Sequence, residues 1–120
     1  MTYKIEAIEN SDIIKITYKG DVSLDERISV VHELCIDYRR STQFKLLIDS
    51  RLLTSAIPPT EQSVFGTYIA SREEFLQAKV AVIIDTAHVI NNIILETSLL
   101  LGHQIRVFNE ENEAIAWLNN

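Results

Sequence analysis

Two short runs of mostly apolar residues constrain this fold more than any other feature. They extend from Phe44 to Asp49 and from Val80 to Asp85, and each ends in an aspartate. A strand with one solvent-exposed face alternates between apolar and polar residues, whereas a strand of a parallel sheet that is covered on both faces is apolar throughout. We therefore expect both runs to be central strands of a parallel sheet, with each aspartate at the end of its strand.

The segments around these two runs indicate a hairpin and several helices. In Ile13–Lys19, Ile14, Ile16 and Tyr18 alternate with polar residues, which is typical of a strand with one dry face. Together with the strand-like segment Tyr3–Ile8, it predicts an N-terminal antiparallel hairpin. The remaining expected elements are a helix that begins at the Ser23/Glu26 capping box, a helix after Pro58-Pro59-Thr60, a helix from about His88 to Leu101, a strand Gln104–Phe108 and a closing helix capped by Asn109.

These elements predict an α/β fold in the order ββαβαβαβα. A hairpin followed by alternating helices and strands gives a mixed five-stranded sheet with crossover helices. The chain has 120 residues, of which 47% are hydrophobic, so it is long enough for one buried core and too short for two. We see no repeat or linker, and we expect a single domain over residues 1–120.

Composition and charge exclude several classes of function. No apolar run reaches the ~20 residues that cross a bilayer, and the N-terminus does not resemble an export signal, so we expect a cytoplasmic protein without a membrane span. The net charge of −6 disfavours nucleic acid as a partner. Cys35 is the single cysteine, and His32, His88 and His103 lack the spacing of metal ligands, so we expect no disulfide, metal site or cofactor.

Three stretches of the sequence resemble a known family. They are Tyr18-Lys19-Gly20-Asp21-Val22-Ser23, Leu46-Leu47-Ile48-Asp49-Ser50-Arg51, and the ending Ile105-Arg106-Val107-Phe108-Asn109-Glu110 through Ala114-Ile115-x-Trp117-Leu118. With the element order they are similar to the SpoIIAA-like proteins, small bacterial chains whose fold is shared by STAS domains and by the lipid-binding lobe of CRAL-TRIO proteins. The resemblance covers essentially the whole chain and implies a SpoIIAA-like, STAS-like fold.

Two departures limit what this resemblance implies about function. STAS domains that act as anti-sigma-factor antagonists carry an Asp-Ser-Ser-Gly-type motif after the middle strand, and phosphorylation of that serine switches partner binding. The corresponding stretch, Asp49–Thr60, has hydroxyl side chains but no Asp-Ser-x-Gly. CRAL-TRIO proteins close their lipid pocket with additional helices, which a chain this short lacks.

The carboxyl ends of the expected parallel strands form the predicted functional edge. In open α/β sheets, ligands meet the crevice outside these ends, where loops expose side chains. The loop Arg51–Thr60 adds the apolar residues Leu52, Leu53, Ala56 and Ile57, which either fold back over the core or form an exposed patch. The candidate residues for binding a ligand or partner are Asp49, Ser50, Arg51, Leu53, Thr54, Ser55, Asp85, Thr86 and His88.

Several of these residues have both a chemical and a structural interpretation. Asp49 and Asp85 could act in acid–base chemistry or hold a cation, or each could cap the turn after its strand. Arg51 could grip an anion or pair with either aspartate. His88 could act as a base or be a polar residue at a helix end. Because no nucleophile elbow, phosphate-binding glycine loop or His-Glu-x-x-His occurs, we expect no enzyme.

The leading hypothesis is a non-enzymatic STAS-like regulatory module that binds an unknown protein partner through the strand-end edge, the Arg51–Thr60 loop and the His88 helix. The alternative is a carrier or sensor of a small apolar ligand such as a fatty acid, suggested by the fold kinship and by apolar helix faces around Phe65, Tyr68 and Ile90. The apolar content also suggests a homodimer. A weaker hypothesis is phosphorylation at Ser50, Thr54, Ser55 or Thr60.

Overall fold

The fold is built on a mixed five-stranded sheet. The computed structural model describes residues 2–38, 44–54, 57–75, 77–85 and 104–120. Their strands lie side by side in chain order, with the first pair antiparallel and the other pairs parallel. The predicted fold class is therefore confirmed. The strands are β1 (Tyr3–Ala7), β2 (Ile13–Gly20), β3 (Lys45–Leu53), β4 (Lys79–Ile83) and β5 (Gln104–Phe108).

The N-terminal hairpin of β1 and β2 turns through a short polar segment, as predicted. Ile8 donates its backbone N–H to the carbonyl of Ile13 at 3.0 Å, and the Ser11 hydroxyl accepts from the Ile13 N–H at 3.0 Å. Asn10 has a φ of 61°, in the left-handed region that asparagine tolerates better than most residues. This turn fixes the register of the hairpin, in which Tyr3 lies opposite Tyr18.

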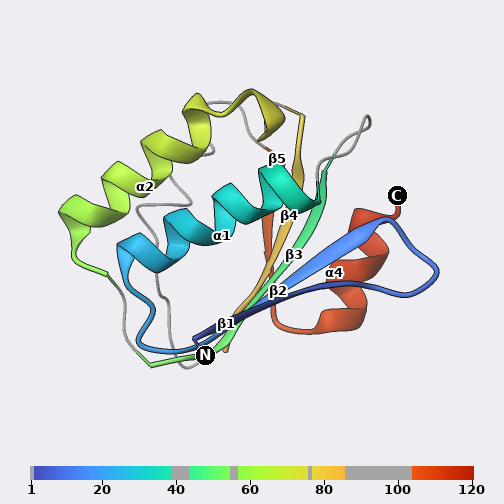
Figure 1. Ribbon diagram of the computed structural model, residues 1–120. Helices are drawn as coiled ribbons and strands as arrows, with labels where there is room; N and C mark the ends of the chain where they lie inside the picture. Colours follow the sequence, from blue (N-terminus) through green and yellow to red (C-terminus); the bar gives the residue numbers. More distant parts are fainter. Residues whose placement is uncertain (1, 39–43, 55–56, 76, 86–103) are drawn as a thin grey trace.

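Helices cover both faces of the sheet (Figure 1). Helices α1 (Leu24–Asp37) and α2 (Pro59–Ser71) lie on one face, and α4 (Glu111–Leu118) lies on the other. Each face has its own apolar core, because strand side chains alternate between the two faces. Ile14 and Ile16 point toward α1, whereas Ile13 and Leu47 point toward α4. No helix in the described ranges is long and apolar enough to cross a bilayer.

Helix α1 begins where the capping box predicts. The Ser23 hydroxyl accepts from the Glu26 N–H at 3.2 Å, and the Glu26 carboxylate accepts from the Ser23 N–H at 3.1 Å. On the buried face of α1, Arg27 donates its Nε–H to the carbonyl of Val22 at 3.2 Å. Cys35 is also buried, as expected for a cysteine that acts as a small hydrophobe.

Three boundaries differ from the predictions. Asp49 does not end its strand, because β3 continues to Leu53. Asp85 does not end its strand either, because β4 stops at Ile83. The closing helix is capped at Glu110 rather than Asn109, without a side-chain hydrogen bond at the cap. After α2, a short 3-10 helix, η1 (Glu73–Phe75), follows. The helix predicted from about His88 to Leu101 lies outside the described residues.

Candidate functional site

A bulge in β3 interrupts the regular register between β2 and β3. Thr17 of β2 lies opposite Asp49, but Lys19 lies opposite Leu52, so β3 carries one residue more than β2 between these pairs. An extra residue shifts the alternation of side chains between the two faces. Leu52 is consequently 54% exposed on the side of the sheet that carries α4, while Leu53 points into the other core and is 5% exposed.

This bulge explains two errors in the sequence prediction. Leu52 and Leu53 were expected to leave the sheet, but both belong to β3. Leu53 is therefore a core residue, and its buried side chain cannot contact a partner. Ile57, from the same predicted loop, is buried as well, so this part of the apolar segment folds back over the core. Among the described residues of the segment, Leu52 is the exposed apolar one.

A charged cluster lies on the α4 side of the sheet, beside the bulge. It consists of Lys15, Asp49, Arg51 and Glu111. Arg51 donates through Nε to Oδ1 of Asp49 at 2.9 Å and through Nη2 to Oδ2 at 2.8 Å. Lys15 donates to Glu111 at 2.7 Å and lies 4.0 Å from Asp49. Glu111 is also 3.7 Å from Arg51, so the four charges form a closed network from three elements.

Electrostatics holds the Asp49 carboxylate in its ionised form. Burial is the largest influence and opposes ionisation, but the hydrogen bonds and charge of Arg51 and the charge of Lys15 together outweigh it. The pKa of Asp49 is therefore lowered from its ordinary value of 3.8. The hydrogen bond to Asp49 raises the pKa of Arg51 in turn. A carboxylate that is ionised and held bidentately is a poor proton donor and acceptor at neutral pH.

The ends of β3, β4 and β5 lie next to one another, as the sequence predicted. Asp49 is in register with Ile83, which is in register with Phe108. The Ser50 hydroxyl donates to the carbonyl of Ile83 at 2.7 Å, and the Ile84 N–H donates to the carbonyl of Phe108 at 2.9 Å. Because β3 runs beyond Asp49, the edge is stepped, with the β2–β3 side projecting beyond β4 and β5.

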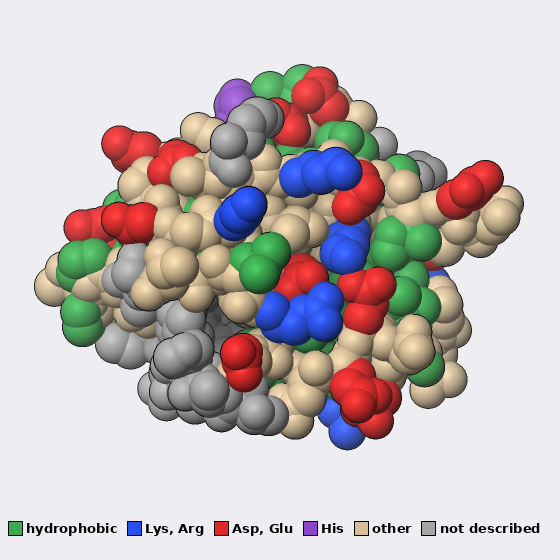
Figure 2. All heavy atoms as spheres, turned by 90° about the horizontal axis from the view of Figure 1, so that it is seen from below, with side chains coloured by type: hydrophobic (Ala, Val, Ile, Leu, Met, Phe, Trp, Pro, Cys, Tyr) green, Lys and Arg blue, Asp and Glu red, His purple; other side chains and the backbone are tan. Residues whose placement is uncertain are grey.

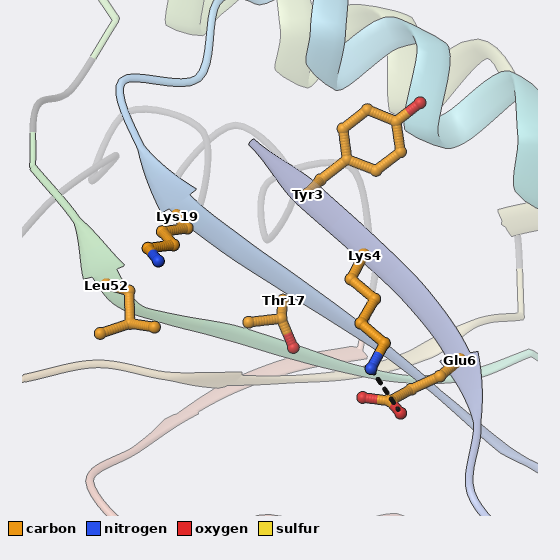
Figure 3. A pocket seen from close by; sticks show the side chains of 6 residues that line it. All are labelled: Tyr3, Lys4, Glu6, Thr17, Lys19 and Leu52. Atoms are coloured by element: carbon orange, nitrogen blue, oxygen red, sulfur yellow. Dashed lines mark ion pairs between the residues drawn. The ribbon is translucent and has the colours of Figure 1, made fainter. Parts of the chain in front are cut away.

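An open hollow of about 550 Å³ lies beside this projecting end. Three of the side chains that line it, Thr17, Lys19 and Leu52, come from the end of β2 and from the bulge (Figure 3). Basic and acidic side chains gather side by side across the middle of the face shown in Figure 2. Lys19 has no ion-pair partner among the described residues. Lys19 and Leu52 therefore combine an available positive charge with exposed apolar surface.

The remaining predicted site residues divide into exposed and undescribed ones. Thr54 is exposed directly after β3, and its N–H donates to the carbonyl of Gly20 at 3.0 Å. Asp85 is exposed shortly after β4, and Thr60 is exposed in α2. Ser55, Thr86 and His88 lie outside the described residues.

Four residues of the charged cluster and the hollow were not predicted from the sequence: Lys15, Thr17, Lys19 and Glu111. The alternation in β2 places the first three on one face, and this signal was available in the sequence. No such signal pointed to Glu111, because it lies 96 residues along the chain from its partner Lys15.

Comparisons with known proteins agree with this architecture. A family model described as SpoIIAA-like matches residues 13–119. One solved structure with a similar fold is an uncharacterized protein from the DUF3478 family of Shewanella loihica PV-4, described as having a SpoIIAA-like fold. It superposes with a TM-score of 0.63 at 15% sequence identity, covering 97% of this chain and 91% of the other. No curated protein matches the chain.

Proposed function

Because the chain belongs to the SpoIIAA-like family, we propose that it is a non-enzymatic regulatory module that binds a protein partner. The proposed binding surface, here called the open face, consists of Thr17, Lys19, Arg51 and Leu52. The observation that carries the proposal is Leu52, a leucine held 54% exposed beside the bulge in β3 and next to a network of paired charges.

The composition of the open face supports a protein partner. Interfaces combine an apolar centre with a polar rim, and arginine is enriched at their strongest contacts. On the open face, Leu52 would supply the apolar centre and Lys19 a charge for an acidic group of the partner. Arg51 is 42% exposed in its side chain even while it pairs with Asp49, so it retains donors for a second acceptor.

The pairing of the polar groups supports a role without catalysis. Asp49 is ionised and bound by Arg51, and the Ser50 hydroxyl is engaged with a backbone carbonyl rather than with a basic side chain. A nucleophilic serine needs an adjacent general base. These contacts stabilise the strand ends and hold the open face rigid, which reduces the entropy lost when a partner binds.

The adjoining segments extend the proposed surface. Thr54 is exposed at the end of β3, next to the bulge, so a partner on the open face would reach it. The exposed residues of the predicted Arg51–Thr60 loop, part of which belongs to β3 and α2, are included in the same proposal. The predicted His88 helix lies outside the described residues and stays part of the proposal as a prediction. Leu53 is replaced in it by Leu52, because Leu53 lies in the core.

A pull-down from the native host tests the proposal. The bait is the tagged chain, compared with Leu52→Asp and Lys19→Glu. Val64→Asp is the matched control, because Val64 is also 54% exposed but lies on α2, on the opposite side of the sheet. We expect the wild type and Val64→Asp to retain one specific partner, and Leu52→Asp and Lys19→Glu to lose it. Equal recovery by all four baits would refute the open face as the binding surface.

Native mass spectrometry of the endogenous protein separates this function from the alternatives. Phe65 is buried in the core that faces α1, so its ring is already covered by protein. A partner-bound species without a small-molecule adduct supports the proposed function. A fatty-acid-sized adduct would favour the carrier instead, and an added phosphate would indicate modification of one of the candidate hydroxyls.

A further inference from the structure

Strand β1 forms one edge of the sheet and leaves half of its backbone groups pointing outward. Thr2 accepts from the Lys19 N–H at 2.8 Å, and Ile8 donates to Ile13 at 3.0 Å, so the even-numbered residues of this segment bond to β2. The N–H and C=O groups of Tyr3, Ile5 and Ala7 therefore face away from the sheet. Within the described ranges, no strand pairs with them. Such an edge can add a strand from another chain.

We propose that β1 pairs in antiparallel orientation with β1 of a second copy of this chain, about a twofold axis at Ile5. Tyr3 of one copy then lies opposite Ala7 of the other, and the two Ile5 residues exchange backbone hydrogen bonds. The result is one continuous sheet across the dimer. A twofold axis makes the same patch meet itself, so the patch must be complementary to itself.

The charges on β1 meet this requirement. Lys4 and Glu6 flank Ile5 symmetrically and point to the same face of the sheet (Figure 3). Their side chains are 72% and 43% exposed, with Nζ and Oε2 only 3.7 Å apart. In the proposed pairing each Lys4 lies directly opposite Glu6 of the other copy, in the non-hydrogen-bonded positions where side chains are closest.

The same two charges select the register. If the pairing shifts by two residues in one direction, the two Lys4 side chains lie opposite each other. A shift in the other direction places Glu6 opposite Glu6. Like charges directly opposite each other destabilise a pair of strands, so of these three registers only the one centred on Ile5 is favourable.

On the face of the sheet that carries α1, the proposed junction has exposed apolar surface. A hollow of about 400 Å³ runs between β1 and the outer side of α1, lined by residues that include Tyr3, Ile28, His32 and Ile36. Ile36 is 62% exposed there. Strand pairing alone buries less surface than a stable dimer needs. A twofold axis perpendicular to the sheet brings both α1 helices to the same side, where they cover this hollow and Ile36.

Sedimentation equilibrium with charge-reversal variants tests the proposal. The wild type is expected to reach twice its chain mass of 13.7 kDa. Lys4→Glu and Glu6→Lys each create two like-charge pairs per dimer and should raise Kd roughly tenfold or more. An equimolar mixture of the two variants should associate again, because every pair in the heterodimer is complementary. The double variant Lys4→Glu/Glu6→Lys should also dimerise.

Two controls separate dimerisation from folding and from the proposed function. Lys45 lies on β3, away from the edge strand, and forms an ion pair of 3.4 Å with Asp12. Lys45→Glu breaks this pair and should leave the dimer intact. Leu52→Asp should do the same. A wild-type chain that stays monomeric at all concentrations would overturn the proposal. A chain whose β1 edge binds an unrelated protein instead of a second copy would overturn it as well. So would a dimer indifferent to both reversals, or folded variants that fail to associate when mixed.

Discussion

Replacing Arg51 by methionine should destabilise the folded chain by about 2 kcal/mol, and the structure sets this magnitude. Arg51 makes two hydrogen bonds of 2.9 and 2.8 Å to Asp49. A hydrogen bond to a charged group contributes roughly 1.5–3 kcal/mol when buried. Asp49 is 6% exposed, but the Arg51 side chain is 42% exposed, so solvent screening reduces the pair well below the sum of two buried bonds.

A double-mutant cycle isolates this pair. Arg51→Met leaves a buried carboxylate with Lys15 as its nearest cation, at 4.0 Å, whereas Asp49→Asn removes the charge without changing the shape. Urea unfolding of both single variants and of the double variant at pH 7 should give a coupling energy of about 1–2 kcal/mol. Additive effects, with a coupling energy below about 0.3 kcal/mol, would contradict the proposed strength of the pair.

The coupling energy from the same cycle should decrease in acidic solution. Because the pKa of Asp49 is lowered in the folded chain, its ionised form stabilises the fold above the ordinary pKa of 3.8. That contribution is lost as the pH falls below 3.8 and through the lowered folded-state pKa. The coupling energy should therefore be constant from pH 7 to pH 5 and shrink in more acidic solution. A coupling that grows on acidification would refute this assignment.

Two further predictions test the local structure. Ser23→Ala removes the cap that bonds to Glu26 and should cost about 1 kcal/mol, a fall in Tm of about 4 °C by calorimetry; an unchanged Tm would contradict the capping box. Leu53→Asp buries a charge in the core and should cost more than about 3 kcal/mol in urea unfolding, while Leu52→Asp should cost less than about 0.5 kcal/mol. Equal losses from these neighbouring substitutions would contradict the bulge, which sends one side chain inward and the other outward.

Local sequence signals predicted most of the fold. The apolar runs at Leu46 and Val80 predicted parallel strands, and the Ser23/Glu26 spacing predicted the start of α1, because each depends on neighbours in the chain. The length of β3 depends on pairing with β2 and β4. Asp49-Ser50-Arg51 resembles a loop in sequence, but in the sheet these residues bond to one another and to Ile83.

The candidate site was predictable only in part. Arg51 was expected to pair with Asp49 or Asp85, and the structure pairs it with Asp49. Glu111 joins the same network from the closing helix, which no spacing in the sequence indicates. Leu52 rather than Leu53 is exposed because β3 contains one extra residue, and a shift by one residue moves every later side chain to the other face.

Lysine footprinting of the partner-bound chain tests the open face most directly. All five lysines lie in strands of the sheet: Lys4, Lys15, Lys19, Lys45 and Lys79. Acetylation followed by mass spectrometry reports how accessible each amine is. With the captured partner at saturation, Lys19 should react severalfold more slowly than in the free chain, while Lys45, at the opposite end of the strands, should keep its rate. An unchanged rate at Lys19 in the saturated complex would contradict the account.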